Sequence, residues 1–463
     1  MLKKYVMSRK TLTILLLYVG LTFPSCCSNN FVPLGKNSSI PPRNRLTENS
    51  SKFSDYNFTL KHYKLTTPIT DSERVQWNNS VKPLLVDSTW SSPYNTGHIL
   101  MVPLYVSFLS KEKDWLSDFD NYFREFTKSY PTSNLKNKPD KSPLAKLHFL
   151  YLASEYLALN KEANRPIPQQ KLLNIIQAEF LSVWNLPAWQ WERCPFKNME
   201  KRLRWKLSNF SVKRTYYRAI IDEEMFTLAI GANLRFILQE ESPEILNNSL
   251  DIAYEVLTKE VHFINTLGKK WLFQPGVWSD HRDYAYAGWD NNLSKLTSKR
   301  PVAGIAGDSS HAHRWPVWLI SFQRGFQSRK QKQRVEYIRK LREGLAEQFT
   351  EIVLVPPTRQ VPYYRTKNFM DGQNGVYRYD NHNDKDPTWR GYGSWELSGT
   401  MLLGWWSYLP DPSISKVYCN LASFYPERIS KNILSKLPTY TVKGRENPLK
   451  LINKLACATL YIP

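Results

Sequence analysis

Apolar residues recur every three or four positions along most of the chain, and this spacing predicts helices with one buried face. Series of this kind run from Ile221 to Phe236 and from Leu250 to Ile264. Another begins after Ser142-Pro143, a pair that favours a helix start because serine caps free amides and proline fits the first turn. Further helices are predicted over residues 111–129, 170–185, 313–326 and 331–350.

Continuous apolar runs follow a different pattern. Ile99–Leu109 and Ile352–Tyr364 are predicted strands, and Pro356 and Pro357 break the second. Residues 394–409 are apolar on nearly every side, which predicts a buried central helix. Helices joined by loops, with few strands, indicate a mainly all-α fold. We expect an (α/α) toroid, an incomplete ring of helical hairpins or an irregular bundle, with a few short strands.

The N-terminal region has the composition of an export signal. Four basic residues precede an apolar run over residues 12–23 that is short for a membrane span: Lys3, Lys4, Arg9 and Lys10. The run leads to Cys26-Cys27, where lipid attachment, plain cleavage and an uncleaved anchor are the alternatives. We therefore expect an exported protein: periplasmic, secreted or an outer-membrane lipoprotein, with membrane contact only through this segment.

The whole chain divides into three predicted parts. Residues 1–27 form the predicted signal, residues 28–85 an arm rich in Asn, Ser and Pro, and residues 86–463 a helical domain of the catalytic type. Three cysteines remain beyond the signal, so at most one internal bridge can form, and its pairing cannot be read: Cys194, Cys419 and Cys457. Their spacing does not match a structural zinc site.

Charge and aromatic content narrow the choice of partner. Across 463 residues, 63 basic and 41 acidic residues give a net charge of +22, which favours anionic partners. The 16 Trp and 26 Tyr side chains suit sugar rings. No nucleic-acid motif accompanies the basic stretches Lys201–Lys206 and Lys330–Arg342. We predict that the side chains of both stretches, and those of Glu223-Glu224, point into solvent. An anionic polysaccharide is the expected partner, and nucleic acid is not.

Chemistry-bearing residues gather in three C-terminal loops, at 273–292, 303–315 and 371–393. We expect the three loops to meet at one cleft, because binding residues concentrate on loops held by a rigid scaffold. The aromatic and amide side chains expected to bind substrate are Trp278, Trp289, Asn292, Trp315 and Trp389.

Each loop offers groups for acid–base chemistry. In the first, Asp280-His281 with Tyr284 and Tyr286 places a base beside phenols. In the third, Glu396 is either a general acid or base or a carboxylate stabilised at a helix start.

The second loop contains Asp308, His311, His313 and Arg314, for which three interpretations stay open. The two histidines of a His-x-His segment are candidates for a divalent metal pair, although no cofactor is expected overall. Arg314 with His311 or His313 is a candidate clamp for a substrate carboxylate. In the third interpretation, Asp308 or Ser309 only caps a helix.

The segment from His281 to Gly288 resembles the catalytic histidine region of helical-toroid polysaccharide lyases of the chondroitin and hyaluronan lyase type, over about twenty residues. In those enzymes a tyrosine just after this motif transfers the proton. Asp290 stands at the matching position here, so Tyr284 or Tyr286 would have to substitute. Asn185 and Trp189, in the Trp-rich stretch 184–191, are similar to a substrate-binding asparagine region of that family.

The resemblance implies β-elimination on a uronate-containing glycan. His281 or Tyr286 would remove the C5 proton, while Arg314 would neutralise the carboxylate. The alternatives are a glycoside hydrolase, which needs two carboxyl groups such as Asp280, Asp308 or Glu396, and a non-catalytic envelope protein that binds glycans.

Overall fold

The computed structural model describes most of the chain beyond its first 59 residues. The described residues are 60–87, 92–132, 143–166, 170–189, 195–208, 211–264, 268–291, 299, 301–380, 391–425, 429 and 446–463. The predicted signal, most of the predicted arm, Asn292, Trp389 and Cys194 lie outside this set.

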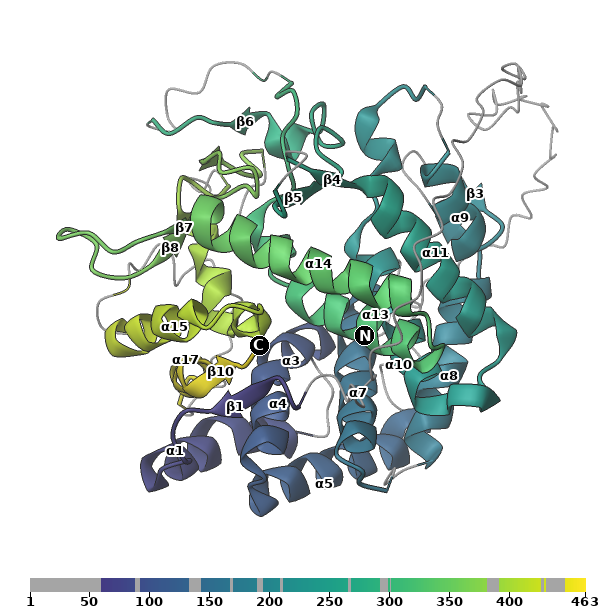
Figure 1. The fold of residues 1–463 in the computed structure, drawn as a ribbon, viewed down its shortest axis with the longest axis vertical. Helices are drawn as coiled ribbons and strands as arrows, with labels where there is room; N and C mark the ends of the chain where they lie inside the picture. Colours follow the sequence, from purple (N-terminus) through teal and green to yellow (C-terminus); the bar gives the residue numbers. More distant parts are fainter. Residues whose placement is uncertain are drawn as a thin grey trace, which may run out of the picture.

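Helices make up most of the described structure, as the sequence predicts (Figure 1). The longer ones are α4 (Met101–Ser110), α5 (Lys113–Ser129), α7 (Leu144–Glu162), α8 (Gln170–Asn185), α10 (Asp222–Leu238), α11 (Glu244–Glu260), α13 (Trp315–Ser328), α14 (Lys332–Gln348), α15 (Ser413–Phe424) and α17 (Leu449–Ala458). The shorter ones are α1 (Asp71–Gln76), α2 (Lys82–Leu85), α3 (Pro93–Ile99), α9 (Met199–Lys206) and α12 (Ser309–Ala312).

The strands that the structure describes form small antiparallel pairs. These pairs are β1 (Tyr63–Leu65) with β10 (Thr459–Tyr461), β2 (Ala188–Trp189) with β3 (Pro195–Phe196), β4 (Val261–Phe263) with β5 (Trp271–Phe273), β6 (Tyr286–Ala287) with β9 (Gly375–Val376), and β7 (Leu354–Val355) with β8 (Arg365–Thr366). The pair β6–β9 joins the first predicted loop to the third. The pair β4–β5 joins the start of the first loop to the segment that follows α11.

Periodicity predicted several helices correctly, but one of the predicted strands is a helix. The helices predicted at 111–129, 170–185, 313–326 and 331–350 are confirmed as α5, α8, α13 and α14. The strand predicted at Ile99–Leu109 is wrong, because most of this run is α4. Residues from Met101 to Phe108 are all buried, so α4 has no polar face by which its period could be recognised.

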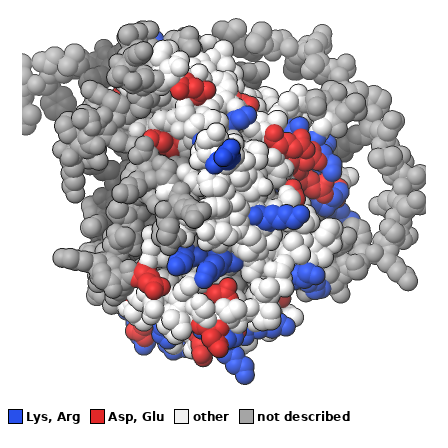
Figure 2. Space-filling model, turned by 90° about the vertical axis from the view of Figure 1, so that its left-hand side faces the viewer, with Lys and Arg blue, Asp and Glu red and all other residues white. Residues whose placement is uncertain are grey.

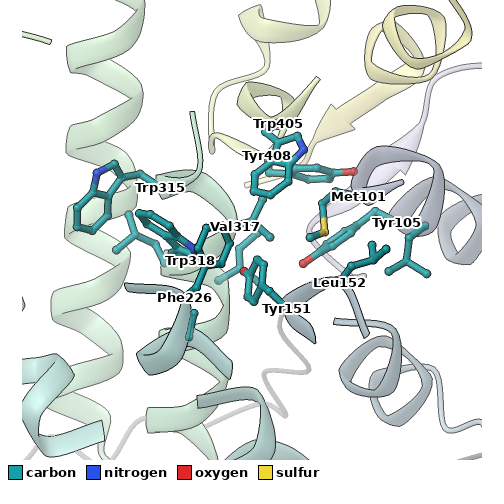
Figure 3. Close-up of a cluster of buried hydrophobic side chains, with 14 of the residues drawn as sticks. Met101, Tyr105, Tyr151, Leu152, Phe226, Trp315, Val317, Trp318, Trp405 and Tyr408 are labelled. Atoms are coloured by element: carbon teal, nitrogen blue, oxygen red, sulfur yellow. The ribbon is translucent and has the colours of Figure 1, made fainter. Parts of the chain in front are cut away.

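Three helices form the centre of the molecule. Helix α10 packs between α7 and α13, with α8, α11 and α14 packed on this group. Figure 3 shows the aromatic side chains that fill the contacts, including Tyr151 of α7, Phe226 of α10 and Trp318 of α13. Burial of these apolar faces stabilises the packing of the three helices.

A buried ionic network joins the same three helices. Arg324 of α13 donates to Glu155 and Glu162 of α7, each at 2.6 Å, and Asn233 of α10 donates to Glu155 at 2.8 Å. Arg324 and Glu155 are fully buried. Because a buried charge without its partner is costly, this network fixes how the central helices sit against one another.

The predicted central helix at 394–409 is buried, but it is not one helix. It forms two 3₁₀ segments, Glu396–Leu403 and Trp405–Tyr408, separated at Gly404. Gly404 has φ 82°, and a Cβ atom there would lie 2.8 Å from a methyl group of Val102 in α4. The close approach to α4 requires glycine, and its left-handed backbone interrupts the helix.

The folded body begins before residue 86. Strand β1 pairs with β10, and Trp77 is fully buried and stacked on Trp115 with ring centroids 4.1 Å apart. Residues 60–85 of the expected arm therefore belong to the folded domain.

The end of the chain is fixed covalently as well. A disulfide joins Cys419 of α15 to Cys457 of α17, which settles the pairing that the sequence leaves open. Among the described helices, none combines the length and apolarity that a membrane crossing requires.

Candidate active site

Basic and acidic side chains lie among one another on the described surface shown in Figure 2. The net charge of +22 therefore does not by itself mark a binding face there. Any selective recognition of an anion on this side has to come from particular side chains held in a cavity.

Two neighbouring cavities combine residues from all three predicted loops. The larger has a volume of about 290 Å³ and includes Trp278, His281, Asp308 and Met370 in its lining. The smaller has about 130 Å³ and includes Arg314 and Glu396. His311, Tyr377 and Arg378 line both. The three loops thus meet, and these shared side chains stand between the cavities.

His311 and Asp308 form a hydrogen-bonded pair at this boundary. Asp308 caps the short helix α12 by accepting from the backbone amide of His311 at 3.0 Å. Its carboxylate also accepts from Nδ1 of His311 at 2.8 Å, from the hydroxyl of Ser310, and from the hydroxyl of Tyr284 at 3.0 Å. Asp308 is 2% exposed, whereas the side chain of His311 is 34% exposed.

The protonation of this pair follows from its contacts. Burial alone raises the pKa of Asp308, but His311, Ser310 and Arg378 outweigh burial and lower that pKa below its usual value. An ionised carboxylate only accepts hydrogen bonds, so Nδ1 of His311 must carry the hydrogen. Nε2 of neutral His311 then has a lone pair and can accept a proton.

Asp222, the first residue of α10, lies on the other side of the imidazole. Its carboxylate is 3.8 Å from Nε2 of His311 and forms an ion pair with Arg314. Arg314 also donates to the Tyr94 hydroxyl at 3.0 Å and to Nε2 of His98 at 3.3 Å. All three nitrogens of this 2% exposed guanidinium are therefore engaged, and Arg314 holds Asp222 in place.

A second buried ionic cluster fixes the first turn of α10. Glu224 is fully buried and accepts from Lys206 at 2.7 Å and from Arg202 at 2.9 Å. Glu223 pairs with Arg202 at 2.8 Å. The prediction of solvated side chains is wrong for Glu224, Arg202 and Lys206, because each charge has a partner that offsets its desolvation. Because Asp222 directly precedes Glu223 and Glu224 in the first turn of α10, this cluster also fixes the position of Asp222.

Arg378 is the guanidinium that faces the cavities. Its backbone has a left-handed φ of 56°, and Gly391 packs directly against its carbonyl group. Nε donates to Asp283 at 3.1 Å, and the guanidinium lies 5.0 Å from the ring centroid of Tyr377. The side chain is 36% exposed, and its two terminal nitrogens have no hydrogen-bonding partner among the described residues. This geometry suits bidentate binding of a carboxylate.

His281 lines the larger cavity as the sequence predicts, but with the opposite hydrogen placement to His311. Its Nδ1 accepts from the backbone amide of Asp283 at 3.2 Å. Burial lowers the pKa of His281, although Asp283 opposes the shift. A neutral ring that accepts on Nδ1 carries its hydrogen on Nε2 and is a donor. His281 can therefore hydrogen-bond a substrate oxygen, whereas His311 can remove a proton.

The His-x-His segment is a helical turn, so its two rings diverge. His311 faces Asp308, while His313 is buried against His98 and Trp405, with ring centroids 5.3 and 5.2 Å away. The expectation that both rings lie on one side of an extended segment is therefore wrong. Within the described part of the chain, no three or more His, Cys, Asp or Glu side chains are arranged to hold a metal ion.

His313 belongs to a stack of buried histidines behind the site. The ring of His98 lies 4.3 Å from that of His148 and 5.3 Å from that of His313. Burial lowers the pKa of all three well below the usual value, and Arg314 lowers them further. These histidines are therefore neutral in the folded protein and form an uncharged support for Arg314.

The other predicted site residues divide between the cavities and the rest of the fold. Tyr284, Trp278 and Trp315 line the larger cavity, and Glu396 lines the smaller. Those that line neither cavity are Tyr286, buried in β6; Trp289, beside it; Asp280, bonded to Thr215; and Asn185, exposed at the end of α8. Asn292 and Trp389 lie outside the described residues, and so does the side chain of Trp189.

Several cavity residues were missed from the sequence. Tyr377 and Arg378 lie within the third predicted loop, so their region was found but not their role. Asp283 lies within the His281 segment, where its carboxylate could have been noted. Asp222 opens a predicted helix, and Tyr94 and His98 come from α3. These carry no local sequence signal, because their roles depend on contacts with Arg314 far along the chain.

Comparison with protein-family models, curated proteins and solved structures found no match to this chain. The chemistry that this chain can perform is therefore inferred from the geometry of its site.

Proposed function

We propose that this protein is an enzyme that cleaves an anionic, uronate-containing glycan by β-elimination, with His311 as the base. The observation that carries the proposal is the Asp308–His311 pair, whose accepting nitrogen lies at a cavity boundary beside the open guanidinium of Arg378. A base and a carboxylate-binding group at one place are what removal of a proton next to a carboxylate needs.

In the proposed reaction, Arg378 binds the uronate carboxylate and makes the C5 proton more acidic. Nε2 of His311 takes that proton, the C4–C5 double bond forms, and the C4–O bond to the neighbouring sugar breaks. The imidazolium returns its proton to the departing oxygen, so His311 ends neutral. Asp308 keeps the ring in its accepting tautomer, and Asp222, 3.8 Å from Nε2, stabilises the imidazolium. His281 donates a hydrogen bond to a substrate oxygen.

Hydrolysis is less well supported by the carboxyl groups. A hydrolase needs one carboxyl group that stays protonated beside one that is ionised. Asp222, Asp283 and Asp308 line the larger cavity, and each is bonded to an arginine or a histidine. The pKa of Asp308 is lowered, which is the wrong direction for an acid. A non-catalytic glycan-binding protein would not need the tautomer of His311 that Asp308 fixes.

The proposal includes a fold and a location. Helices α7, α10 and α13 would be the inner helices of an incomplete (α/α) ring, and α8, α11 and α14, which pack on this group, would be outer ones. Such a ring is consistent with the expected likeness to helical-toroid lyases. The Cys419–Cys457 disulfide supports export to an oxidising compartment, as periplasmic, lipidated or secreted protein.

The test is incubation of the full chain with polysaccharides that contain uronate, such as hyaluronan, chondroitin sulfate, alginate and polygalacturonate, and with a neutral glucan. Elimination creates a conjugated double bond, so ultraviolet absorbance should rise together with new reducing ends for at least one acidic substrate. The neutral glucan should give neither signal.

Two results would count against the proposal. New reducing ends without the ultraviolet signal would indicate hydrolysis instead. Retention of acidic glycans on immobilised protein, with no product of either kind across the whole panel, would leave a binding protein.

A further inference from the structure

The two cavities differ in charge, although they share a wall. Among the described residues, four carboxylates and one arginine line the larger cavity: Asp222, Glu223, Asp283, Asp308 and Arg378. Within the same part of the chain, two arginines and one carboxylate line the smaller cavity: Arg314, Arg378 and Glu396. Carboxylates therefore outnumber arginines in the described lining of the larger cavity, and arginines outnumber carboxylates in that of the smaller one, which favours an anionic group in the smaller cavity.

The cavities also differ in polarity and size. Indole and phenyl groups, including those of Phe273, Trp278 and Trp315, line the larger cavity of about 290 Å³. Such faces stack on a neutral sugar ring. Hydroxyl-bearing side chains, Tyr94, Tyr392 and Thr400 among them, line the smaller cavity of about 130 Å³. A space of that size and polarity suits a small charged substituent better than a chain of rings.

We infer that the smaller cavity is a subsite for the acidic group of the sugar, a carboxylate or a sulfate ester, while the larger cavity takes an uncharged sugar ring. Arg378 reaches this subsite with two terminal nitrogens that have no hydrogen-bonding partner among the described residues, and buried Arg314, paired with Asp222, also lines it. Glu396 is the one carboxylate among the described residues that line the smaller cavity. This inference depends on the proposed function for the identity of the substrate, but the binding it describes does not require turnover.

The placement gives the substrate a direction. With the acidic group in the smaller cavity and its neighbour in the larger, the bond between the two sugars crosses the shared wall at His311. The base then stands at the junction of the two rings, where the C5 proton and the departing oxygen both lie.

Equilibrium titration of the full chain tests the inference. The His311→Gln variant is titrated calorimetrically with glucuronate, with glucose and with inorganic sulfate. We expect glucuronate to bind about tenfold more tightly than glucose, because one charge-assisted bidentate contact is worth at least that factor. Competition by sulfate would show that the subsite accepts either anion, and its absence that the subsite is specific for a carboxylate.

Two matched neutralisations locate the anion. Glu396→Gln removes a carboxylate from the smaller cavity and should strengthen glucuronate binding several-fold, leaving glucose unchanged. Glu223→Gln removes one from the larger cavity and should not strengthen glucuronate binding. Arg378→Gln should abolish the preference for glucuronate, whereas Arg282→Gln, an exposed neighbour of His281, should preserve it.

The reverse pattern would overturn the inference. Stronger glucuronate binding in Glu223→Gln and not in Glu396→Gln would place the anion in the larger cavity, and equal affinity for glucuronate and glucose would remove the anion subsite altogether. Failure of the elimination assay with the expected titration pattern would reject the proposed reaction and keep the subsite.

Discussion

The hydrogen positions on two histidine rings decide which of them can act as a base. A carboxylate partner forces the Nδ1 hydrogen onto His311, whereas a backbone amide forces His281 to carry its hydrogen on Nε2. Both residues lie in loops that the sequence singles out, and the sequence favours His281. Their difference lies in the hydrogen-bond partners, which only the folded chain reveals.

A pair of substitutions tests this assignment. His311→Gln should lower turnover at least about a hundredfold, because general-base catalysis typically contributes that much, while substrate still binds. His281→Gln should cost less, since its side-chain amide can still donate a hydrogen bond. Initial rates of the ultraviolet assay measure both, with exposed His262→Gln as the control. Loss of activity only in His281→Gln would return the base to His281.

The buried histidines predict a loss of stability in mild acid. The folded pKa values of His98, His148 and His313 are lowered, so below about pH 6.5 the unfolded chain binds protons that the folded chain does not. The free energy of unfolding should therefore fall with decreasing pH, by about 1.4 kcal/mol per pH unit for each histidine that stays neutral.

Urea unfolding at a series of pH values measures this slope. His148→Phe should flatten it, because one proton-binding group is lost from the unfolded chain, and exposed His262→Gln should retain most of it. Stability that does not change between pH 7.5 and pH 5.5 would contradict the neutral state of the stack.

At the scale of elements, glycine decides where the segment at 394–409 bends. Composition predicts a single buried helix there, and burial is confirmed. The break at Gly404 arises from a contact with Val102 in α4, a residue far away in the chain. Such a contact is invisible to any pattern within the segment itself.

Gly404→Ala should destabilise the protein by about 1–3 kcal/mol, since alanine is strained at φ 82° and its methyl group would meet Val102. Gly304→Ala is the matched control. Gly304 has φ 68°, but a Cβ atom there would meet nothing within 4 Å, so it measures backbone strain alone. Thermal unfolding should show the larger loss for Gly404→Ala, and equal losses would mean that packing against α4 contributes little.

The sequence predicted local features of this protein and missed those that join distant parts. Amphipathic spacing located α5, α8, α13 and α14, and the density of His, Asp and Trp located the three loops. The pairing of Arg314 with Asp222 spans 92 residues and leaves no periodic trace. The largely apolar run of α4 predicts a strand, because periodicity alone does not distinguish a short buried helix from a buried strand.

At the scale of the whole molecule, the Cys419–Cys457 bridge holds the last helix in place. The bonded cysteines are 38 residues apart, so the bridge restricts the unfolded chain, and its loss should cost about 2–4 kcal/mol. Cys419→Ser with Cys457→Ser should lower the melting temperature, and a reducing agent should do the same to the wild type. The double variant should not respond further to reduction, and a response would point to a different bridge.

Strand β1 is among the first parts of the described chain to be synthesised, and its partner β10 is the last. Until β10 is made, β1 has no partner strand. The buried hydroxyl of Tyr63, which donates to the Tyr408 carbonyl group and accepts from Arg342, then lies beside an edge that β10 has not yet covered. Contacts between such distant positions form slowly. The edge along β1 can therefore close only after Thr459–Tyr461 has been made, so its closure comes late in folding.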